Sequence, residues 1–236
     1  MNEPVLLTRD EAVAILTLNR PERRNAINEA LLKALYDGIE TVTRDDSIKA
    51  AIITGNGKAF CSGLDLDCLA TDNLMDPRGD GRDLVDLMAA CPKPVIGAIN
   101  GYAITGGFEL ALNCDFLIAS EAAAFADTHA KVGIRPGWGM TQFLQQAVGQ
   151  RLAKQFSLTC KFISAEKALA CGLVNEVVKP DALLPRAKEI AGMICAVNFD
   201  MALTVKELIE YRNRASLAEA LAHERQPLKE MIQKSS

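Results

Sequence analysis

The sequence predicts an α/β fold in which a β-β-α unit is wound repeatedly around one core and is followed by a C-terminal helical region. Three observations indicate this fold. Short apolar strands alternate with segments whose apolar residues recur at helical spacing. Three of the strands, around Val13, Ile52 and Ile96, are separated by roughly 40 residues, which suggests a repeated unit. From Arg151 onward the pattern is largely helical.

The length and composition are those of a single globular domain. The 236 residues are 49% apolar and 24% charged, and no linker rich in Ser, Gly or Pro divides them. We assign residues 1–195 to the spiral core and residues 196–236 to the helical region. The net charge of −4 argues against nucleic acid or an anionic membrane as a partner.

The cysteines and histidines predict neither disulfides nor a metal site. Seven cysteines and two histidines occur without a C-x-x-C pair or a convincing metal-ligand spacing, so we expect free thiols and no metal. The N-terminus carries acids and lacks the basic stretch of a signal peptide, and no apolar run is long enough to span a bilayer. These features predict a cytoplasmic protein.

The first elements of the chain are a hairpin, a helix and a buried strand. The segments from Val5 to Thr8 and from Ala12 to Leu18 flank a polar turn and predict the hairpin. Apolar residues at helical spacing predict a helix of about four turns that starts near Asn28. A short buried strand, Ala50 to Thr54, ends at a glycine-rich turn.

The middle of the chain contains a polar loop between two further elements. Residues 71–82 are rich in glycine and polar residues and lack periodicity, which is typical of a surface loop with freedom to move. A helix from about Asp83 to Ala90 follows, and Val95 to Ile99 is the next strand.

The second half begins with two short strands and then becomes helical. The strands are expected at Asp115 to Ala119 and at Ala124 to Ala126. A rigid loop at residues 133–139 opens a helix that reaches Val148. Beyond Arg151, the strand from Asn175 to Val178 is the one interruption of the helical pattern.

The segment from Ile99 to Asp115 is the strongest candidate for a functional site. It places a strand, a tight glycine turn and the start of an apolar helix within seventeen residues. The adjacent glycines Gly106 and Gly107 allow close approach of a ligand and leave N–H groups free at a helix start. Together with Glu109 just beyond them, they could form an oxyanion hole beside a general base.

Other interpretations of these residues stay open at this stage. The turns at residues 62–64 and 105–107 could each present one N–H to the same oxygen, or could be ordinary connections. Glu109 could lie on a solvent-facing stripe with Asn113, four residues later. His129 could be a core histidine, and Asp127 a cap at a strand end. The glycine turns lack the spacing of a phosphate-binding loop or of a dinucleotide fingerprint.

Five motifs occur in order along nearly the whole chain. They read N-R-P-E-R-R-N-A-I (residues 19–27), A-F-C-S-G-L-D-L (59–66), K-P-V-I-G-A-I-N-G-Y-A-I-T-G-G-F-E-L (93–110), R-P-G-W-G-M-T-Q (135–142) and I-S-A-E-K-A-L-A-C-G-L-V (163–174). In this order the chain resembles the crotonase superfamily, the enoyl-CoA hydratase/isomerase family. Its members share one scaffold but catalyse different reactions.

The resemblance implies a crotonase-like (ClpP/crotonase) spiral of β-β-α repeats with a C-terminal helical trimerisation region, assembled as a homotrimer or homohexamer. The oxyanion-hole amides would be those of Leu64 and Gly106, which polarise an acyl-CoA thioester carbonyl, and Glu109 would be the first catalytic glutamate. No cofactor is implied, apart from coenzyme A as part of the substrate. The implied substrate-binding positions are Arg23, Arg24, Ala26, Ser62, Gly63, Leu64, Asp65, Leu66, Gly106, Thr128 and Gly137.

One catalytic position departs from the family pattern. The second glutamate of similar hydratases lies seven residues before the proline of the Pro-Gly pair, and this position is His129. A protonated His129 could still supply a proton to Cα while Glu109 takes one from water.

The resemblance therefore implies an enoyl-CoA hydratase that adds water to a trans-2-enoyl-CoA. The alternatives are another crotonase-type reaction (isomerase, hydrolase or decarboxylase) and a non-catalytic acyl-CoA-binding protein. Isomerases similar to this family rely on an acid at the substituted position, so an isomerase is less consistent with His129.

Overall fold

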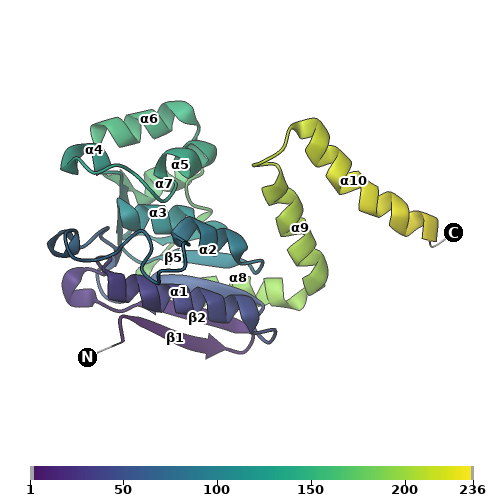
Figure 1. Ribbon diagram of the computed structural model, residues 1–236, viewed down its shortest axis with the longest axis horizontal. Coiled ribbons are helices and arrows are strands. Elements are labelled where there is room, and N and C mark those ends of the chain that lie inside the picture. The colour runs from purple at the N-terminus through teal and green to yellow at the C-terminus, as the bar shows by residue number, and fades with distance from the viewer. Residues whose placement is uncertain (1–2, 235–236) are drawn as a thin grey trace. The chain divides into compact units, whose positions relative to one another are not determined.

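The computed structural model describes residues 3–234. The chain divides into two compact units, residues 1–195 and residues 196–236. The first unit contains two β-sheets with helices packed around them, and the second consists of helices (Figure 1). None of the helices between residues 3 and 234 combines the length and the hydropathy that a bilayer-spanning segment requires.

The larger sheet has six strands in the order β1-β2-β3-β5-β7-β10. β1 and β2 form the predicted antiparallel hairpin, and the remaining neighbours are parallel. The parallel strands are covered on both faces, so their sequences run apolar instead of alternating. The strands are β1 (Val5–Asp10), β2 (Val13–Leu18), β3 (Ala50–Gly55), β5 (Val95–Ile99), β7 (Phe116–Ser120) and β10 (Glu176–Val178).

The smaller sheet has four strands in the order β4-β6-β8-β9. These are β4 (Ala59–Cys61), β6 (Tyr102–Ile104), β8 (Ala124–Ala126) and β9 (Ile163–Ser164). β4, β6 and β8 are parallel, and β9 is antiparallel to β8. The consecutive pairs β3/β4, β5/β6 and β7/β8 each place one strand in each sheet, and a helix follows each pair. This arrangement confirms the predicted β-β-α spiral.

The helices of the core unit cover the two sheets. They are α1 (Glu29–Arg44), α2 (Leu84–Ala90), α3 (Gly106–Leu112), α4 (His129–Val132), α5 (Met140–Val148), α6 (Gln150–Thr159), α7 (Ala165–Ala170) and α8 (Leu183–Ala196), with short 3-10 turns η1 (Pro21–Arg23), η2 (Leu66–Cys68) and η3 (Pro180–Ala182). The Asn28 side chain caps α1 by accepting the amide of Leu31 at 3.0 Å. α4 and β9 have four and two residues, too few to show a periodic pattern, and were not predicted.

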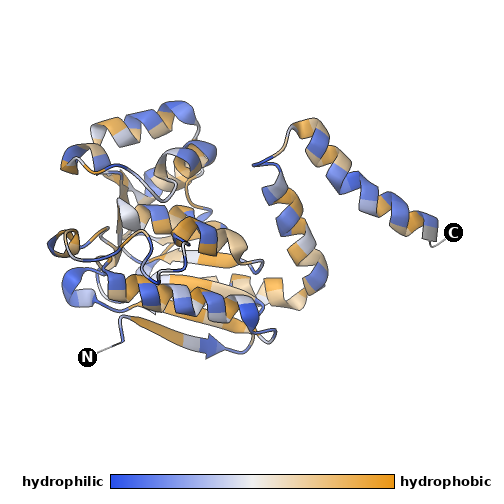
Figure 2. Ribbon diagram, in the orientation of Figure 1, coloured by the Kyte–Doolittle hydropathy of each residue, from blue (hydrophilic) through white to orange (hydrophobic). Residues whose placement is uncertain are grey.

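Apolar side chains fill both sides of the six-stranded sheet. On one side, Leu31 and Leu35 of α1 belong to the larger buried cluster, which also contains residues of α2 and α3. On the other side, Leu183, Ala187 and Ala191 of α8 pack into a smaller cluster with the sheet. In Figure 2 the central strands are correspondingly hydrophobic, whereas α1 is banded by polar residues. This packing buries the six-stranded sheet on both of its faces.

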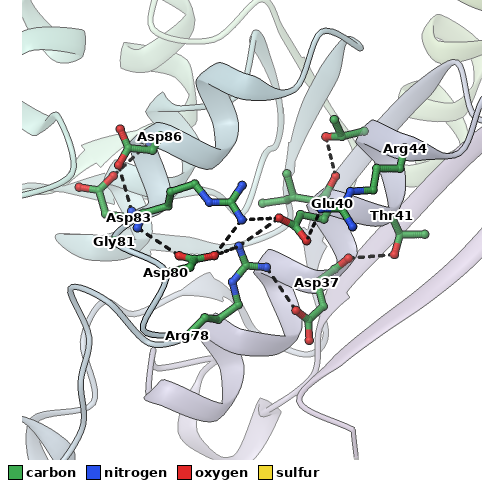
Figure 3. A network of polar contacts seen from close by, with 12 residues as sticks. Asp37, Glu40, Thr41, Arg44, Arg78, Asp80, Gly81, Asp83 and Asp86 are labelled. Carbon is green, nitrogen blue, oxygen red and sulfur yellow. Dashed lines mark hydrogen bonds and ion pairs between the residues drawn. The ribbon is translucent and has the colours of Figure 1, made fainter.

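The loop between η2 and α2 is tied to α1 by ion pairs. Arg78 contacts Asp37 and Glu40, each at 3.3 Å, and Arg82 contacts Glu40 at 2.6 Å. Both guanidinium groups also reach Asp80 at 2.8 Å (Figure 3). The segment has no regular secondary structure, as predicted, but these contacts and a mostly buried Arg78 side chain, 14% exposed, anchor it at its centre.

The second unit contains α9 (Phe199–Tyr211) and α10 (Leu217–Lys234). Within it, the His223 ring stacks on Tyr211 with centroids 4.0 Å apart, so α10 contacts α9. Met201, Val205 and Ile209 follow one another at intervals of four residues on α9, and all three are exposed. This unit therefore presents an apolar stripe on a helix surface.

Candidate active site

Three turns meet at one edge of the smaller sheet. They are residues 62–64 after β4, residues 105–107 after β6 and residues 127–129 after β8. β6 pairs in parallel with both β4 and β8, so the carboxyl ends of the three strands lie at the same edge. Each turn of the spiral thus contributes one loop to a single site.

The first turn leaves the Leu64 amide free. Gly63 has a φ of +94°, and its carbonyl accepts the Ile27 amide at 2.7 Å. The Asp65 amide in turn donates to the Ile27 carbonyl at 2.8 Å. These bonds fix the residues on both sides of Leu64, while its own N–H has no partner among the described residues.

The second turn begins α3 and lies against the first. The Gly106 amide is in the first turn of the helix, where no carbonyl four residues earlier belongs to the same helix. A Cβ placed on Gly63 would be 3.5 Å from the Gly106 nitrogen, and one on Gly106 would be 3.5 Å from the Leu64 side chain. The structure therefore places the two turns next to each other, whereas spacing in the sequence left them open as ordinary connections.

A glycine is required at residue 107 by the close approach of β4. A Cβ at Gly107 would lie 2.1 Å from the Cys61 carbonyl oxygen, far inside ordinary contact distance. Cys61 is the last residue of β4 and directly precedes the first turn. Contact between the bare Gly107 backbone and Cys61 thus sets the spacing between the two turns.

Glu109 is buried, with 2% of its surface exposed, so its solvent-facing alternative is wrong. Its Oε1 accepts the backbone amides of Trp138 at 2.9 Å and Met140 at 3.2 Å. Its Oε2 lies 3.6 Å from Nε2 of His129. One carboxylate oxygen is therefore fixed by the 136–139 loop and the first residue of α5, and the other faces the imidazole.

His129 is held between two carboxylates. Its Nδ1 is 2.7 Å from Oδ1 of Asp127, and the same oxygen accepts the His129 backbone amide at 3.1 Å. Asp127 and His129 are 2% and 6% exposed. The sequence suggested Asp127 only as a cap. Its D-x-H spacing to His129 could have indicated the contact between the two side chains as well.

The electrostatics favour a charged imidazole. Burial opposes protonation, but the carboxylates of Asp127 and Glu109 outweigh it and raise the pKa of His129 to about 9. Burial also opposes ionisation of Asp127, yet hydrogen bonds from His129 and Ser157 hold the pKa of its carboxyl below the usual range. At neutral pH the imidazole is consequently cationic and can act as an acid.

A pair of hydroxyls links the second and third turns. Oγ1 of Thr105 lies 2.5 Å from Oγ1 of Thr128, and the Thr105 amide donates to the Ala126 carbonyl at 2.9 Å. Thr105 adopts φ +51° and ψ −114°, an unusual conformation for a residue with a side chain. Thr128, a predicted substrate-binding residue, is therefore adjacent to the glycine turn.

The remaining predicted substrate-binding residues surround the first turn. Arg23 is exposed and pairs with Asp67 at 3.1 Å, and Arg24 is exposed beside it. The Ser62 amide donates to the Arg24 carbonyl at 3.1 Å. Ala26 is buried, whereas Leu66 is 60% exposed.

Asp65 has a structural contact that the sequence did not indicate. Its buried carboxylate lies 3.0 Å from the Arg20 guanidinium. Arg20 also donates to the Ala26 carbonyl at 2.5 Å, and its amide donates to the Asn25 side chain at 2.9 Å. This buried pair clamps the segment before α1 onto the turn that carries Leu64.

Gly137 lies in the loop whose next residue, Trp138, donates its amide to Glu109. A Cβ on Gly137 would contact the Met75 side chain at 3.7 Å, so the anchored 69–83 loop reaches this position. Leu74 is buried, and Met75 is 56% exposed. A hollow of ≈ 470 Å³ beside Gly137 is lined by the start of α2, the 136–139 loop and α5.

No metal-ligand cluster is present in the described part of the chain, where three His, Cys, Asp or Glu side chains nowhere form a suitable group. All seven cysteines are free thiols. The site therefore consists of backbone amides, two carboxylates and one imidazole. Such a set can polarise a carbonyl and move protons beside it.

Comparison with known proteins gives a consistent result. The sequence profile described as enoyl-CoA hydratase/isomerase matches residues 8–236. The probable enoyl-CoA hydratase 1, peroxisomal, of Arabidopsis thaliana is 40% identical over 214 residues, 91% of this chain and 81% of the relative. The crotonyl-CoA hydratase of Syntrophomonas wolfei is 41% identical over 196 residues, 81% of this chain and 75% of the relative.

Solved structures agree with these sequence matches. An enoyl-CoA hydratase from Mycobacterium avium superposes with a TM-score of 0.81 at 41% identity and covers 99% of both chains. One from Mycobacterium marinum has a TM-score of 0.90 at 32% identity, covering 98% of this chain and 91% of the other. The two-sheet spiral seen here is the fold of those hydratases.

Proposed function

Because the chain belongs to the enoyl-CoA hydratase/isomerase family, we propose that it hydrates trans-2-enoyl-CoA thioesters with Glu109 as base and His129 as acid. The observation that carries this assignment is the opposition of Glu109 Oε2 and His129 Nε2 at 3.6 Å, beside two turns with free amides. The protein is an acyl-CoA-processing enzyme of the enoyl-CoA hydratase class.

The free amides of Leu64 and Gly106 bind the thioester carbonyl oxygen. Their N–H groups withdraw electron density through the conjugated double bond and make Cβ electrophilic. When oxygen adds to Cβ, negative charge develops on the carbonyl oxygen, where the amides and the N-terminal end of α3 stabilise it. The glycine turn therefore favours the enolate over the ground state.

Glu109 and His129 divide the proton transfers. Glu109 takes a proton from water as the water oxygen bonds to Cβ, and His129 donates the proton on Nε2 to Cα. The product is a 3-hydroxyacyl-CoA. Transfer of the proton from Glu109 to His129 then restores the starting charges, so each turnover consumes one water and no net proton.

Several other features belong to the same proposal. Arg23 and Arg24, exposed next to the first turn, bind the phosphates of coenzyme A, which enters as part of the substrate. No other cofactor, nucleic acid or membrane takes part. The exposed apolar stripe of α9 supports assembly as a homotrimer or homohexamer through residues 196–236. The free thiols support a cytoplasmic location.

The activity is tested with crotonyl-CoA by following loss of the enoyl thioester absorbance. The Glu109→Gln variant keeps an oxygen that accepts the Trp138 and Met140 amides, so we expect a folded protein whose turnover is lower by about 100-fold or more. Glu166→Gln, on the exposed surface of α7, is the matched control. Unchanged turnover in Glu109→Gln would exclude this residue as the base.

Mass spectrometry of the products separates hydration from the alternatives. A gain of one water identifies the hydratase, whereas release of free CoA identifies a hydrolase. A product of unchanged mass that separates from the substrate by chromatography identifies an isomerase, and loss of carbon dioxide from a malonyl-type thioester identifies a decarboxylase. Tight binding of every thioester without any product would show an acyl-CoA-binding protein that lacks catalysis.

A further inference from the structure

We propose that Asp127 is a positioning residue, which holds Nδ1 of His129 and so directs the N–H on Nε2 toward the reacting carbon. This inference rests on the acid role proposed for His129. Asp127 does not reach the substrate side of the imidazole, because its carboxylate contacts the opposite ring nitrogen. It acts through His129 and not on the substrate.

The first argument is the geometry of the imidazole. A carboxylate only accepts hydrogen bonds, so the 2.7 Å contact with Asp127 requires a proton on Nδ1. A ring flip would place a carbon against this carboxylate and forfeit the bond. The contact therefore fixes both the tautomer and the orientation, and Nε2 can point only toward Glu109, 3.6 Å away.

The carboxylate itself is held from two sides. One of its oxygens accepts the His129 backbone amide at 3.1 Å, and the Ser157 hydroxyl from α6 hydrogen bonds to the same side chain. Asp127 is 2% exposed, so solvent does not compete for these bonds. A buried carboxylate with this much support is set in one position before substrate arrives.

The second argument is the charge balance during turnover. Before reaction, His129 lies between two carboxylates, Asp127 and Glu109. Once Glu109 has taken the proton from water, it is neutral and no longer stabilises the imidazolium. Asp127 keeps its charge throughout, so His129 retains one counter-ion until it delivers its proton to Cα.

The third argument is the return to the starting state. After donation, His129 is neutral with the remaining proton on Nδ1, where Asp127 holds it. Its Nε2 then carries a lone pair that faces the protonated Glu109 and can accept that proton. The opposite tautomer would present an N–H to Glu109 and block this transfer, so Asp127 allows the pair to reset.

A purely structural role makes a different set of predictions. Asp127 also accepts the amide of His129, the first residue of α4, in a contact that acts as a cap just before the helix, and an Asn could keep it by its carbonyl oxygen. Asp127→Asn therefore separates the cap from the charge. If positioning is the role, we expect kcat to fall by about 100-fold or more with KM changed much less. A role limited to the cap predicts nearly normal kcat.

The pH dependence and a double variant give the decisive readouts. The charged groups in contact with the imidazole are Glu109 from α3 and Asp127, and α6 contributes the neutral Ser157 to Asp127. Without the Asp127 charge, His129 loses its proton at lower pH, so the deficit of Asp127→Asn should shrink as the pH falls. The double variant is a separate test: when His129 is already Gln, Asp127→Asn should cause no further loss of kcat. The proposal would be overturned if the loss of kcat in Asp127→Asn did not depend on pH and if the double variant lost the product of the two single-variant factors.

The tautomer of His129 can also be read directly in the unaltered protein, with a variant needed only to assign the signals. It has two histidines, so comparison with His129→Gln assigns the ¹⁵N resonances of His129. Above the pKa, we expect the proton on Nδ1 and the lone pair on Nε2, and the reverse tautomer would refute the role of Asp127. Full activity of His129→Gln would instead refute the acid assignment in the proposed function. The two failures are therefore distinguishable.

Discussion

The spacing between the two oxyanion turns can be tested by adding one methyl group at Gly107. An alanine Cβ there would be 2.1 Å from the Cys61 carbonyl oxygen and 2.7 Å from the Cys61 carbonyl carbon. Ordinary carbon–oxygen contacts begin at about 3.3 Å, so α3 and the end of β4 must separate by roughly 1 Å. Both neighbours are backbone atoms, and no side-chain rotation relieves the overlap.

This displacement acts directly on the proposed oxyanion hole. The Gly106 amide precedes residue 107, and Leu64 follows the displaced Cys61 by three residues. A misplacement of about 1 Å in a catalytic group lowers rates by about 100-fold, and overpacking in a core costs about 1–3 kcal/mol. We therefore expect kcat/KM for crotonyl-CoA hydration to fall by about 100-fold in Gly107→Ala, with moderately reduced stability.

Gly192→Ala is the matched control for this experiment. Gly192 lies within α8, and a Cβ there would meet no atom within 4 Å. The same methyl group should stabilise this helix by about 0.5–1 kcal/mol and leave activity unchanged. Activity is measured from the enoyl absorbance, and stability from urea unfolding followed by circular dichroism. Near-normal kcat/KM in a folded Gly107→Ala protein would refute the idea that this contact sets the spacing of the two amides.

Three further predictions concern charged groups. The pKa of His129 is about 9 in the folded protein, against an ordinary value of 6.5, so the stability from its charge should be complete below pH 6.5 and lost as the pH rises through 9. The Tm measured from pH 6 to 10 should show this loss of stability. The His129→Gln variant should not show it. Arg78→Ala removes the contacts to Glu40 and should lower Tm by a few degrees and speed hydrogen exchange in the 69–83 loop; unchanged exchange would show that this pair does not anchor the loop. Asp65→Asn leaves the Arg20 guanidinium without its carboxylate and should cost about 1–3 kcal/mol in urea unfolding, whereas an unchanged midpoint would exclude the proposed clamp.

The elements whose apolar periodicity is long or strong could be predicted from the sequence. The stripe that includes Leu31 and Leu35 predicted α1, and continuous apolar runs predicted β3 and β5. Asp83 and Pro92 bounded α2. These predictions succeed because burial of one helix face, or of both strand faces, determines the pattern of apolar residues within a short segment of the sequence. α4 and β9 are too short for such a signal.

The sequence by itself also determined the chemical groups of the site. The adjacent glycines after β6 and the glutamate three residues into α3 indicated an oxyanion hole with a base, and the ordered motifs indicated His129 as its partner. A solvent-facing Glu109 remained open as an alternative, because a helix of seven residues does not establish which face is buried. The structure shows that Glu109 faces inward, because the 136–139 loop packs against it and donates the Trp138 amide to its carboxylate.

Only the tertiary structure decided how these groups meet. Parallel pairing of β4, β6 and β8 brings three turns that are distant in the sequence to one edge, and no local pattern encodes this pairing. The same pairing places Glu109 opposite His129, and the fold of the turn after β8 gives Asp127 its contact with Nδ1. Residue types and their order are local properties of the chain, whereas the distances that make them a site arise from strand pairing and packing between segments far apart in sequence.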